Sequence, residues 1–165
     1  ITGGAGNDVL RGKRGNDTYI FALGDDQDTI EDGYGVSSGL GGTDKLVFDA
    51  GISLSDLEVT QQNNSDILIA IAGTSDSVLL KAALTDVDNR IESFEFADGT
   101  ILTHANMVGL SASPDPADNI YYGSSSSETL SGGGGNDTLY GQEGNDTLIA
   151  GEDNDLLRGR WGKDT

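Results

Sequence analysis

The sequence has no cysteine, one histidine, two prolines, one methionine and one tryptophan in 165 residues. The absence of cysteine excludes a disulfide framework and a thiolate zinc site, and a single histidine excludes a multi-histidine metal site. Basic residues are scarce, since nine Lys and Arg face 28 Asp and Glu for a net charge of −19. This charge argues against a nucleic acid partner. The longest apolar run, 67–72, is far shorter than the roughly 18 residues of a membrane-spanning helix.

Glycine is abundant, with 25 residues, and the acidic residues are regularly spaced. From residue 123 the chain reads in blocks of nine: GSSSSETLS, GGGGNDTLY, GQEGNDTLI, AGEDNDLLR and an incomplete GRWGKDT. Each block has Gly or Ala at place one, an acid at place six and, where complete, Leu at place eight. A disordered acidic loop is the alternative, but such segments carry blocks of like charge rather than a period.

The N-terminal part repeats the pattern in blocks that begin at Gly3, Gly12 and Gly39, with a longer block, FALGDDQDTIE, over 21–31. Glycine permits the positive φ angles of tight turns. In the strand that follows each turn, only place eight faces inward. A three-residue strand with one buried side chain is not stable alone, so the blocks are predicted to stack, with blocks n and n+2 on the same side.

Stacking brings the place-six acids of blocks n and n+2 together, for example Asp137 with Asp155. Carboxylates at the roughly 4.8 Å spacing of neighbouring strands repel each other. A cation between the turns reverses this repulsion, and it would meet only carboxylate and carbonyl oxygens. Six to eight oxygen ligands suit calcium better than magnesium, and softer metals have little to hold them here.

These blocks resemble the RTX (repeats-in-toxin) haemolysin-type calcium-binding repeat, GGxGxDxUx. The resemblance implies an all-β fold, a right-handed parallel β-roll of nonapeptide repeats, with about four to six Ca²⁺ ions held in its turns by place-six carboxylates and turn carbonyls. It implies that Asp8 pairs with Asp28 and Asp17 with Asp44. In the C-terminal repeats it implies one site with Gly133, Gly135 and Asp137 opposite Ala150, Glu152 and Asp155. A second site has Gln142, Gly144 and Asp146 opposite Gly159, Trp161 and Asp164, and Gly4, Gly6 and Gly12 complete the predicted N-terminal ligands.

Some turns depart from the repeat. Asn119 and Glu128 stand at place six, and a serine run over 124–127 replaces turn glycines, so sites there are expected to be weak or absent. Asp153 replaces Gly at place four, and Asp tolerates the left-handed region better than most residues.

The middle of the chain resembles the β-rich segment that follows RTX repeats in several secreted proteins. Apolar runs over 66–72 and 77–84 predict strands, 92–96 predicts an exposed strand, and Asp98-Gly99 predicts a tight turn. A short helix is expected over 104–110. The predicted organisation is repeats over 1–47, a β-rich segment over 48–110 that continues and caps the roll, a linker over 111–118, and repeats over 119–165.

The two ends of the chain align at an offset of 147 residues, with nine identities in 18 positions. This favours one cassette (a complete set of repeats and β-rich segment) of a tandem array, against a single cassette that has been cut. Six basic residues lie in these ends: Arg11, Lys13, Arg14, Arg158, Arg160 and Lys163. They either offset the local carboxylate charge or bind an acidic polysaccharide.

No catalytic constellation is evident, and the protein is predicted not to be an enzyme. His104 is expected to be an exposed helix residue, and there is no Gly-x-Ser-x-Gly elbow. The expected function is that of a calcium-binding structural module of a secreted, type I-exported protein. It would fold on calcium at the cell surface or beyond, next to neighbouring cassettes in an adhesin, surface layer or filament. The alternative is a carbohydrate-binding accessory module of a polysaccharide-modifying enzyme.

Overall fold

The computed structural model describes residues 1–33, 39–111 and 117–165. The regular secondary structure of these residues is β-strand apart from one α-helix and two short 3₁₀ turns, which confirms the all-β prediction. The chain divides into two compact units, Ile1–His104 and Ala105–Thr165. In the part of the chain that the structure describes, no helix is both long and apolar enough to span a membrane.

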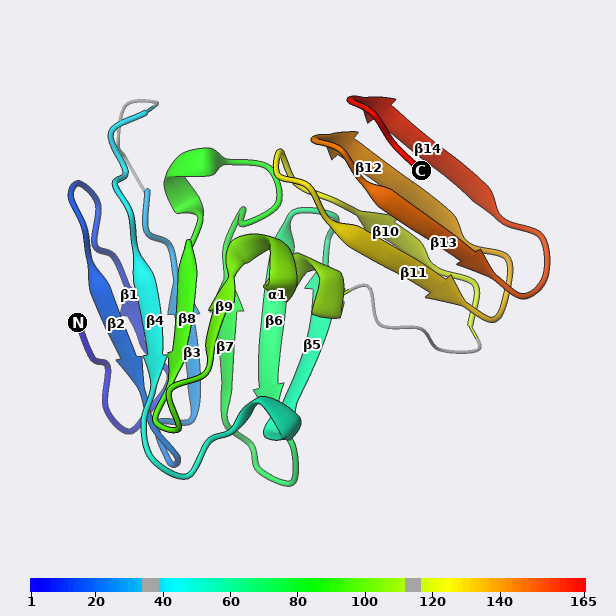
Figure 1. Cartoon of the computed structure of the whole chain (residues 1–165). Coiled ribbons are helices and arrows are strands. Elements are labelled where there is room, and N and C mark those ends of the chain that lie inside the picture. The colour runs from blue at the N-terminus through cyan, green and yellow to red at the C-terminus, as the bar shows by residue number, and fades with distance from the viewer. Residues whose placement is uncertain (34–38, 112–116) are drawn as a thin grey trace. The chain divides into compact units, whose positions relative to one another are not determined.

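The N-terminal repeats place successive strands in two different sheets (Figure 1). β1 (Val9–Leu10) pairs in parallel with β3 (Gln27–Ile30), and β2 (Thr18–Phe21) pairs in parallel with β4 (Lys45–Phe48). Blocks n and n+2 therefore lie side by side, as predicted. This pairing is the one that a parallel β-roll requires, and its right-handed coiling stays a prediction.

The C-terminal repeats follow the same rule with an exact 18-residue register. The first sheet contains β10 (Ile120–Tyr122), β12 (Thr138–Glu143) and β14 (Leu156–Trp161). The second contains β11 (Thr129–Gly133) and β13 (Thr147–Gly151). All of these pairs are parallel, and Leu139 stands opposite Leu157 as Leu130 stands opposite Leu148.

The middle segment extends both N-terminal sheets before it reverses direction. β7 (Ser77–Leu80) adds in parallel to β3, and β8 (Ser93–Phe96) adds in parallel to β4. Antiparallel strands then continue each sheet, with β6 (Asp66–Ile71) and β5 (Leu57–Gln62) after β7, and β9 (Ile101–Thr103) after β8. Short 3₁₀ turns cover Leu54–Asp56 and Val87–Asn89.

The structure of this segment agrees with some of the local predictions and differs from others. The expected turn at Gly99 is present, with a φ of 89°, and the expected helix is α1 (His104–Ser111). β8 was expected to be exposed, and this is wrong, because Phe94 and Phe96 are buried. The expected strand over 77–84 ends at Leu80. Of the expected linker, residues 112–116 lie outside the described residues.

Most place-eight side chains lie in the core, as the repeat predicts, whereas Leu157 on the last strand is exposed. Tyr19, Ile30, Leu46, Leu130 and Leu139 are all buried. In the N-terminal unit, inward-facing aromatic rings from neighbouring strands also contact one another. The ring centroids of Phe21 and Phe48 lie 6.5 Å apart, and those of Phe48 and Phe96 lie 4.9 Å apart and stacked. The register of the parallel strands thus builds a continuous apolar row.

The turns depend on positive φ angles at places two and four. Gly4 and Gly6 have φ values of 78° and 115°. Non-glycine residues adopt the same region where the repeat departs from glycine, namely Lys13, Gln142 and Arg160 at place two and Asp153 at place four. The expected tolerance of Asp153 for this region is confirmed by its φ of 75°.

Candidate metal-binding turns

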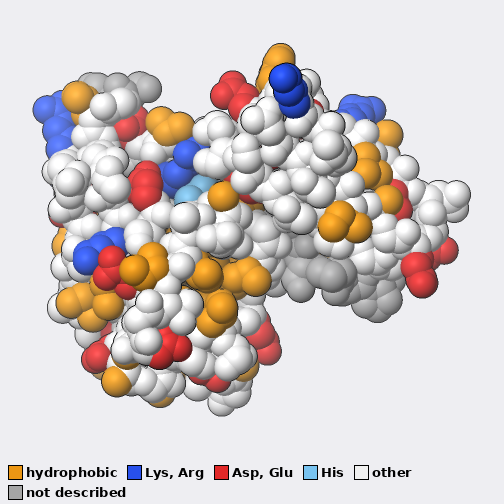
Figure 2. Space-filling model, in the orientation of Figure 1, with side chains coloured by type: hydrophobic (Ala, Val, Ile, Leu, Met, Phe, Trp, Pro, Cys, Tyr) orange, Lys and Arg blue, Asp and Glu red, His pale blue; other side chains and the backbone are white. Residues whose placement is uncertain are grey.

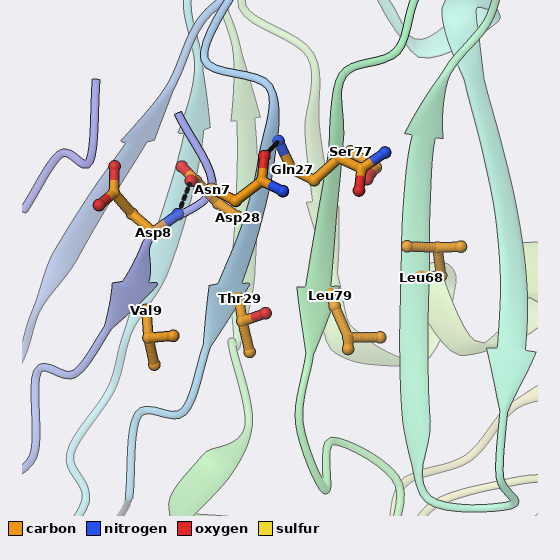
Figure 3. Close-up of a pocket in the computed structure, with 9 residues that line it drawn as sticks. All are labelled: Asn7, Asp8, Val9, Gln27, Asp28, Thr29, Leu68, Ser77 and Leu79. Carbon is orange, nitrogen blue, oxygen red and sulfur yellow. Dashed lines mark hydrogen bonds between the residues drawn. The ribbon is translucent and has the colours of Figure 1, made fainter. Parts of the chain in front are cut away.

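The place-six carboxylates form ladders from coil to coil. The backbone N–H of each place-six residue donates to one carboxylate oxygen of the place-six residue in the stacked coil. Figure 3 shows the first example, in which the Asp8 N–H donates to Asp28 Oδ1 at 3.0 Å. The others join Asp17 to Asp44 at 2.7 Å, Asp137 to Asp155 at 2.9 Å, and Asp146 to Asp164 at 3.0 Å. The structure therefore brings together all four predicted pairs of acids.

In each of these four pairs, one of the two acids has a carboxylate oxygen without a protein partner. The Oδ2 atoms of Asp17, Asp28, Asp137 and Asp146 are buried and accept no hydrogen bond from the described residues. A buried carboxylate oxygen without a partner is costly. A hard cation would satisfy it, so the residues present fit calcium.

Place-one glycines leave a small space beside these oxygens. A Cβ added to Gly132 would lie 2.4 Å from Asp137 Oδ2 and 2.5 Å from the Ala150 carbonyl oxygen. A Cβ added to Gly141 would lie 2.5 Å from Asp146 Oδ2 and 2.9 Å from the Gly159 carbonyl oxygen. Carboxylate and carbonyl oxygens of facing turns thus converge where the glycine has no side chain, in the pairing that the resemblance implies.

Other residues of the predicted ligand set lie in different surroundings. The Gly133 carbonyl accepts a hydrogen bond from the Glu152 N–H at 2.7 Å. The Gly135 N–H donates to Asp153 Oδ2 at 3.2 Å. The side chains of Glu152 and Trp161 are exposed. Their carbonyls, and those of Gly4, Gly6, Gly12, Gln142 and Gly144, stay predicted ligands.

Sequence reasoning did not find Glu92 and Asp32. The Asp44 N–H donates to Glu92 Oε2 at 2.6 Å, so Glu92 continues the ladder in front of β8. The acid in front of an alternating strand was the available signal. Asp32 has no such signal, because it follows β3 and meets Asp17 and Asp44 only through the fold. One carboxylate oxygen of each of these three residues lies within 4.8 Å of the others.

The asparagine at place five was also overlooked as a structural residue. The Oδ1 atoms of Asn7 and Asn16 accept the N–H groups of Gln27 at 3.2 Å and Thr43 at 3.1 Å. Asn136 and Asn145 do the same in the C-terminal unit. The recurrence of Asn before Asp was the signal for this second ladder.

Burial dominates the electrostatics of these turns. It raises the pKa of Asp28, Glu92 and Asp146. It also raises the pKa of Asp32 to about 7, where Asp44 adds to the rise and the Tyr19 hydroxyl opposes it. On the face drawn in Figure 2, Asp and Glu side chains are scattered rather than gathered in one patch. Several place-six carboxylates are instead buried in the turns.

Comparison with known families agrees with this geometry. The model of the RTX calcium-binding nonapeptide repeat matches residues 1–35, 122–157 and 141–165. The repeats at both ends of the chain are therefore RTX calcium-binding repeats. A second model, the haemolysin-type calcium binding protein related domain, matches 66–106, the segment that extends both sheets. RTX repeats are calcium-binding modules of secreted, type I-exported proteins.

Among solved structures, the chain is similar to the extracellular lipase LipA from Serratia marcescens, with 19% identity and a TM-score of 0.26. The match covers 98% of this chain but 27% of the lipase, so the chain spans about a quarter of that protein. No curated protein matches the chain.

One RTX turn satisfies its acid with protein groups instead. Glu128 replaces Asp at place six, and its carboxylate accepts the Ser124 N–H at 3.1 Å and the Ser124 hydroxyl. Both donors come from the serine run that replaces the turn glycines. This turn thus carries fewer oxygens that require a cation than the turns of Asp137 and Asp146.

His104 differs from its expected place. It was expected to be exposed, but it is buried, and neither ring nitrogen has a hydrogen-bond partner among the described residues. Burial lowers its pKa to about 4, and the nearby Arg90 acts in the same direction. The His104 imidazole is therefore neutral and packs as a buried side chain at the start of α1.

Proposed function

We propose that this chain is a structural RTX module that folds outside the cell when calcium fills four of its turns. The observation that carries the proposal is the set of buried, unpartnered Oδ2 atoms at Asp17, Asp28, Asp137 and Asp146. Each would take part in one calcium site, together with the paired carboxylate and turn carbonyls. Calcium supplies positive charge where two acids are held together.

The dependence of folding stability on calcium concentration suits a chain that folds outside the cell rather than in the cytosol. Extracellular calcium modules bind with dissociation constants of about 10⁻⁴ to 10⁻³ M. At a calcium concentration tenfold above this constant, each site adds about 1.4 kcal/mol of stability. Four sites would add about 6 kcal/mol, comparable to the whole stability of a small domain. At submicromolar calcium the gain is close to zero, so the chain would lack this stabilisation before export.

A calcium titration tests the proposal. Circular dichroism in excess EDTA should show loss of β signal, and calcium should restore it. Calorimetry should give about four ions per chain. A β signal that is unchanged by EDTA, together with no measurable calcium binding, would overturn the proposal.

The parent protein is proposed to be an adhesin, surface-layer or filament protein in which cassettes follow one another. The agreement between the two ends of the chain supports this role, since nine of 18 positions are identical. The full-length gene tests it. A downstream region without a second cassette would remove the tandem-array role.

A carbohydrate-binding role is the second candidate, and one surface favours it. Tyr122 and Tyr140 stack with ring centroids 5.0 Å apart on the sheet of β10, β12 and β14. The guanidinium carbons of Arg158 and Arg160 lie 5.6 and 5.0 Å from the Tyr140 ring centroid. Aromatic faces beside arginines suit an anionic polysaccharide.

Titration with alginate decides whether this surface binds. If the role is right, Tyr140→Ala and Arg158→Ala weaken binding. Arg11→Ala serves as the control, since the Arg11 side chain pairs with Glu31 in the other unit. Absence of binding at millimolar alginate would remove this role without affecting the calcium proposal.

A further inference from the structure

Three carboxylates meet in one N-terminal turn, where the ordinary repeat brings two. Asp17 and Asp44 are place-six residues in front of β2 and β4, and Asp32 follows the end of β3. One oxygen of each lies within 4.8 Å of the others. Asp32 is 0% exposed and Asp44 is 2% exposed. Water therefore does little to screen these charges from one another.

Asp32 occupies a position that is glycine in the stacked turn. Leu10 stands opposite Ile30, and the Lys13 N–H donates to the Asp32 carbonyl at 2.9 Å, which aligns Asp32 with Gly12. A Cβ added to Gly12 would lie 2.5 Å from both Asp17 Oδ2 and Asp32 Oδ1. The Asp32 side chain thus points into the turn, and Gly12 provides the space for it.

The hydrogen bonds around this turn hold the three carboxylates but leave oxygens unused. The Tyr19 hydroxyl donates to Asp32 Oδ1 and accepts the Gly12 N–H at 2.7 Å. The Asp17 N–H donates to Asp44 Oδ1 at 2.7 Å. Asp17 Oδ2 and Asp32 Oδ2 remain buried with no hydrogen-bond partner among the described residues. A fully buried side chain with an unsatisfied oxygen aimed into a cluster of acids points to a bound cation.

We infer that Asp32 makes this turn a three-carboxylate cation site, different in charge from the two-carboxylate turns of the same repeat. The inference rests on the proposed calcium function of the turns. A site with three carboxylates keeps one negative charge when calcium binds and is neutral with a trivalent lanthanide. Ligand charge is one of the factors that set affinity in oxygen sites. This turn therefore fills first, and it favours trivalent ions more strongly than the turns of Asp137 and Asp146.

Terbium titration of the full chain tests the inference, with luminescence excited through tyrosine. Tyr19 is hydrogen-bonded to Asp32, so an ion held by Asp32 lies beside this ring. The first equivalent of terbium should give a strongly sensitised signal. Asp32→Asn should weaken this first phase about tenfold and preserve the later phases. Tyr19→Phe should reduce the luminescence of the first phase.

Glu31→Gln is the matched control, because it removes the same charge one residue away, from a side chain that pairs with Arg11 rather than entering the turn. It should titrate like the unmodified chain. If Asp32→Asn also does so, the assignment of Asp32 is overturned while the calcium proposal stands. If no variant binds calcium or terbium, the proposed function itself fails. Circular dichroism in calcium verifies that Asp32→Asn folds, and if it does not, an unchanged first phase in Tyr19→Phe overturns the inference.

Discussion

The two units of this RTX chain contain the same nine-residue repeat but stabilise it differently. In the N-terminal unit the repeat continues into β5–β9, and aromatic rings such as Phe48, Phe94 and Phe96 fill the space between the sheets. In the C-terminal unit the place-eight residues are leucines apart from Tyr121, and Leu157 on the last strand is 38% exposed. The N-terminal unit thus has the larger apolar core, so we expect the C-terminal unit to depend more on the proposed calcium sites.

The largest effect that tests this comparison is calcium removal. With EDTA we expect loss of up to about 6 kcal/mol of ligand stabilisation over four sites. Hydrogen exchange by mass spectrometry on the full chain should show complete loss of protection in β12–β14, while β6 and β7 retain part of theirs. Equal loss of protection in both units would contradict the comparison.

Removal of an aromatic ring should have the next largest effect. Phe48→Ala deletes a fully buried side chain between Phe21 and Phe96 and should lower the stability of the N-terminal unit by about 3–5 kcal/mol. Urea unfolding in saturating calcium measures this. Leu157→Ala is the control and should cost less than about 1 kcal/mol, because that side chain is already partly exposed. Similar losses in the two variants would show that the cores do not differ as described.

The calcium-free N-terminal unit should lose stability as pH rises. The folded-state pKa of Asp32 is about 7, above its ordinary value of about 4, and the pKa values of Asp28 and Glu92 are also raised. Carboxyls with raised pKa values hold protons more strongly in the folded state. The contribution of Asp32 is present below about pH 4 and is lost as the pH rises to about 7, and Asp28 and Glu92 act in the same direction. In the C-terminal unit, burial also raises the pKa of Asp146.

Urea midpoints in EDTA at pH 4.5 and 7.5 measure this dependence, which should amount to a few kcal/mol. Asp32→Asn should flatten it. The lowered pKa values of Asp66 and Asp88 act mainly below pH 4 and do not cancel the trend. A midpoint that rises with pH in EDTA would contradict the prediction.

The smallest expected effect compares two neighbouring C-terminal turns. Asp137→Asn removes a carboxylate with an unpartnered oxygen, and it should lower the calcium stoichiometry by one and the stability in calcium by about 1.4 kcal/mol. Glu128→Gln alters a carboxylate already bonded to Ser124 and should leave the stoichiometry unchanged. Calorimetry distinguishes the two. Loss of one ion in Glu128→Gln would show that the serine-rich turn binds calcium as well.

Much of the fold could be predicted because the repeat encodes it locally. The spacing of Asp137 and Asp155, at 18 residues, fixes the coil length, and the place-eight leucines fix the inward face. The middle segment was harder, because a pattern such as Glu92–Phe96 reads as an exposed strand unless its neighbours are known. In the structure Phe94 and Phe96 stand opposite the buried Leu46 and Phe48 of β4, so they share the inward face of that sheet.

The sequence by itself determined the period, the parallel pairing of alternate blocks, the carboxylate pairs and the choice of calcium. These follow from contacts between residues at a constant separation along the chain. Only the tertiary structure decided that Asp32 joins Asp17 and Asp44, that Glu92 extends their ladder, and that His104 is buried. The physical reason is that these contacts connect segments at irregular separations, so no periodic pattern carries them, and they exist only once the sheets have formed.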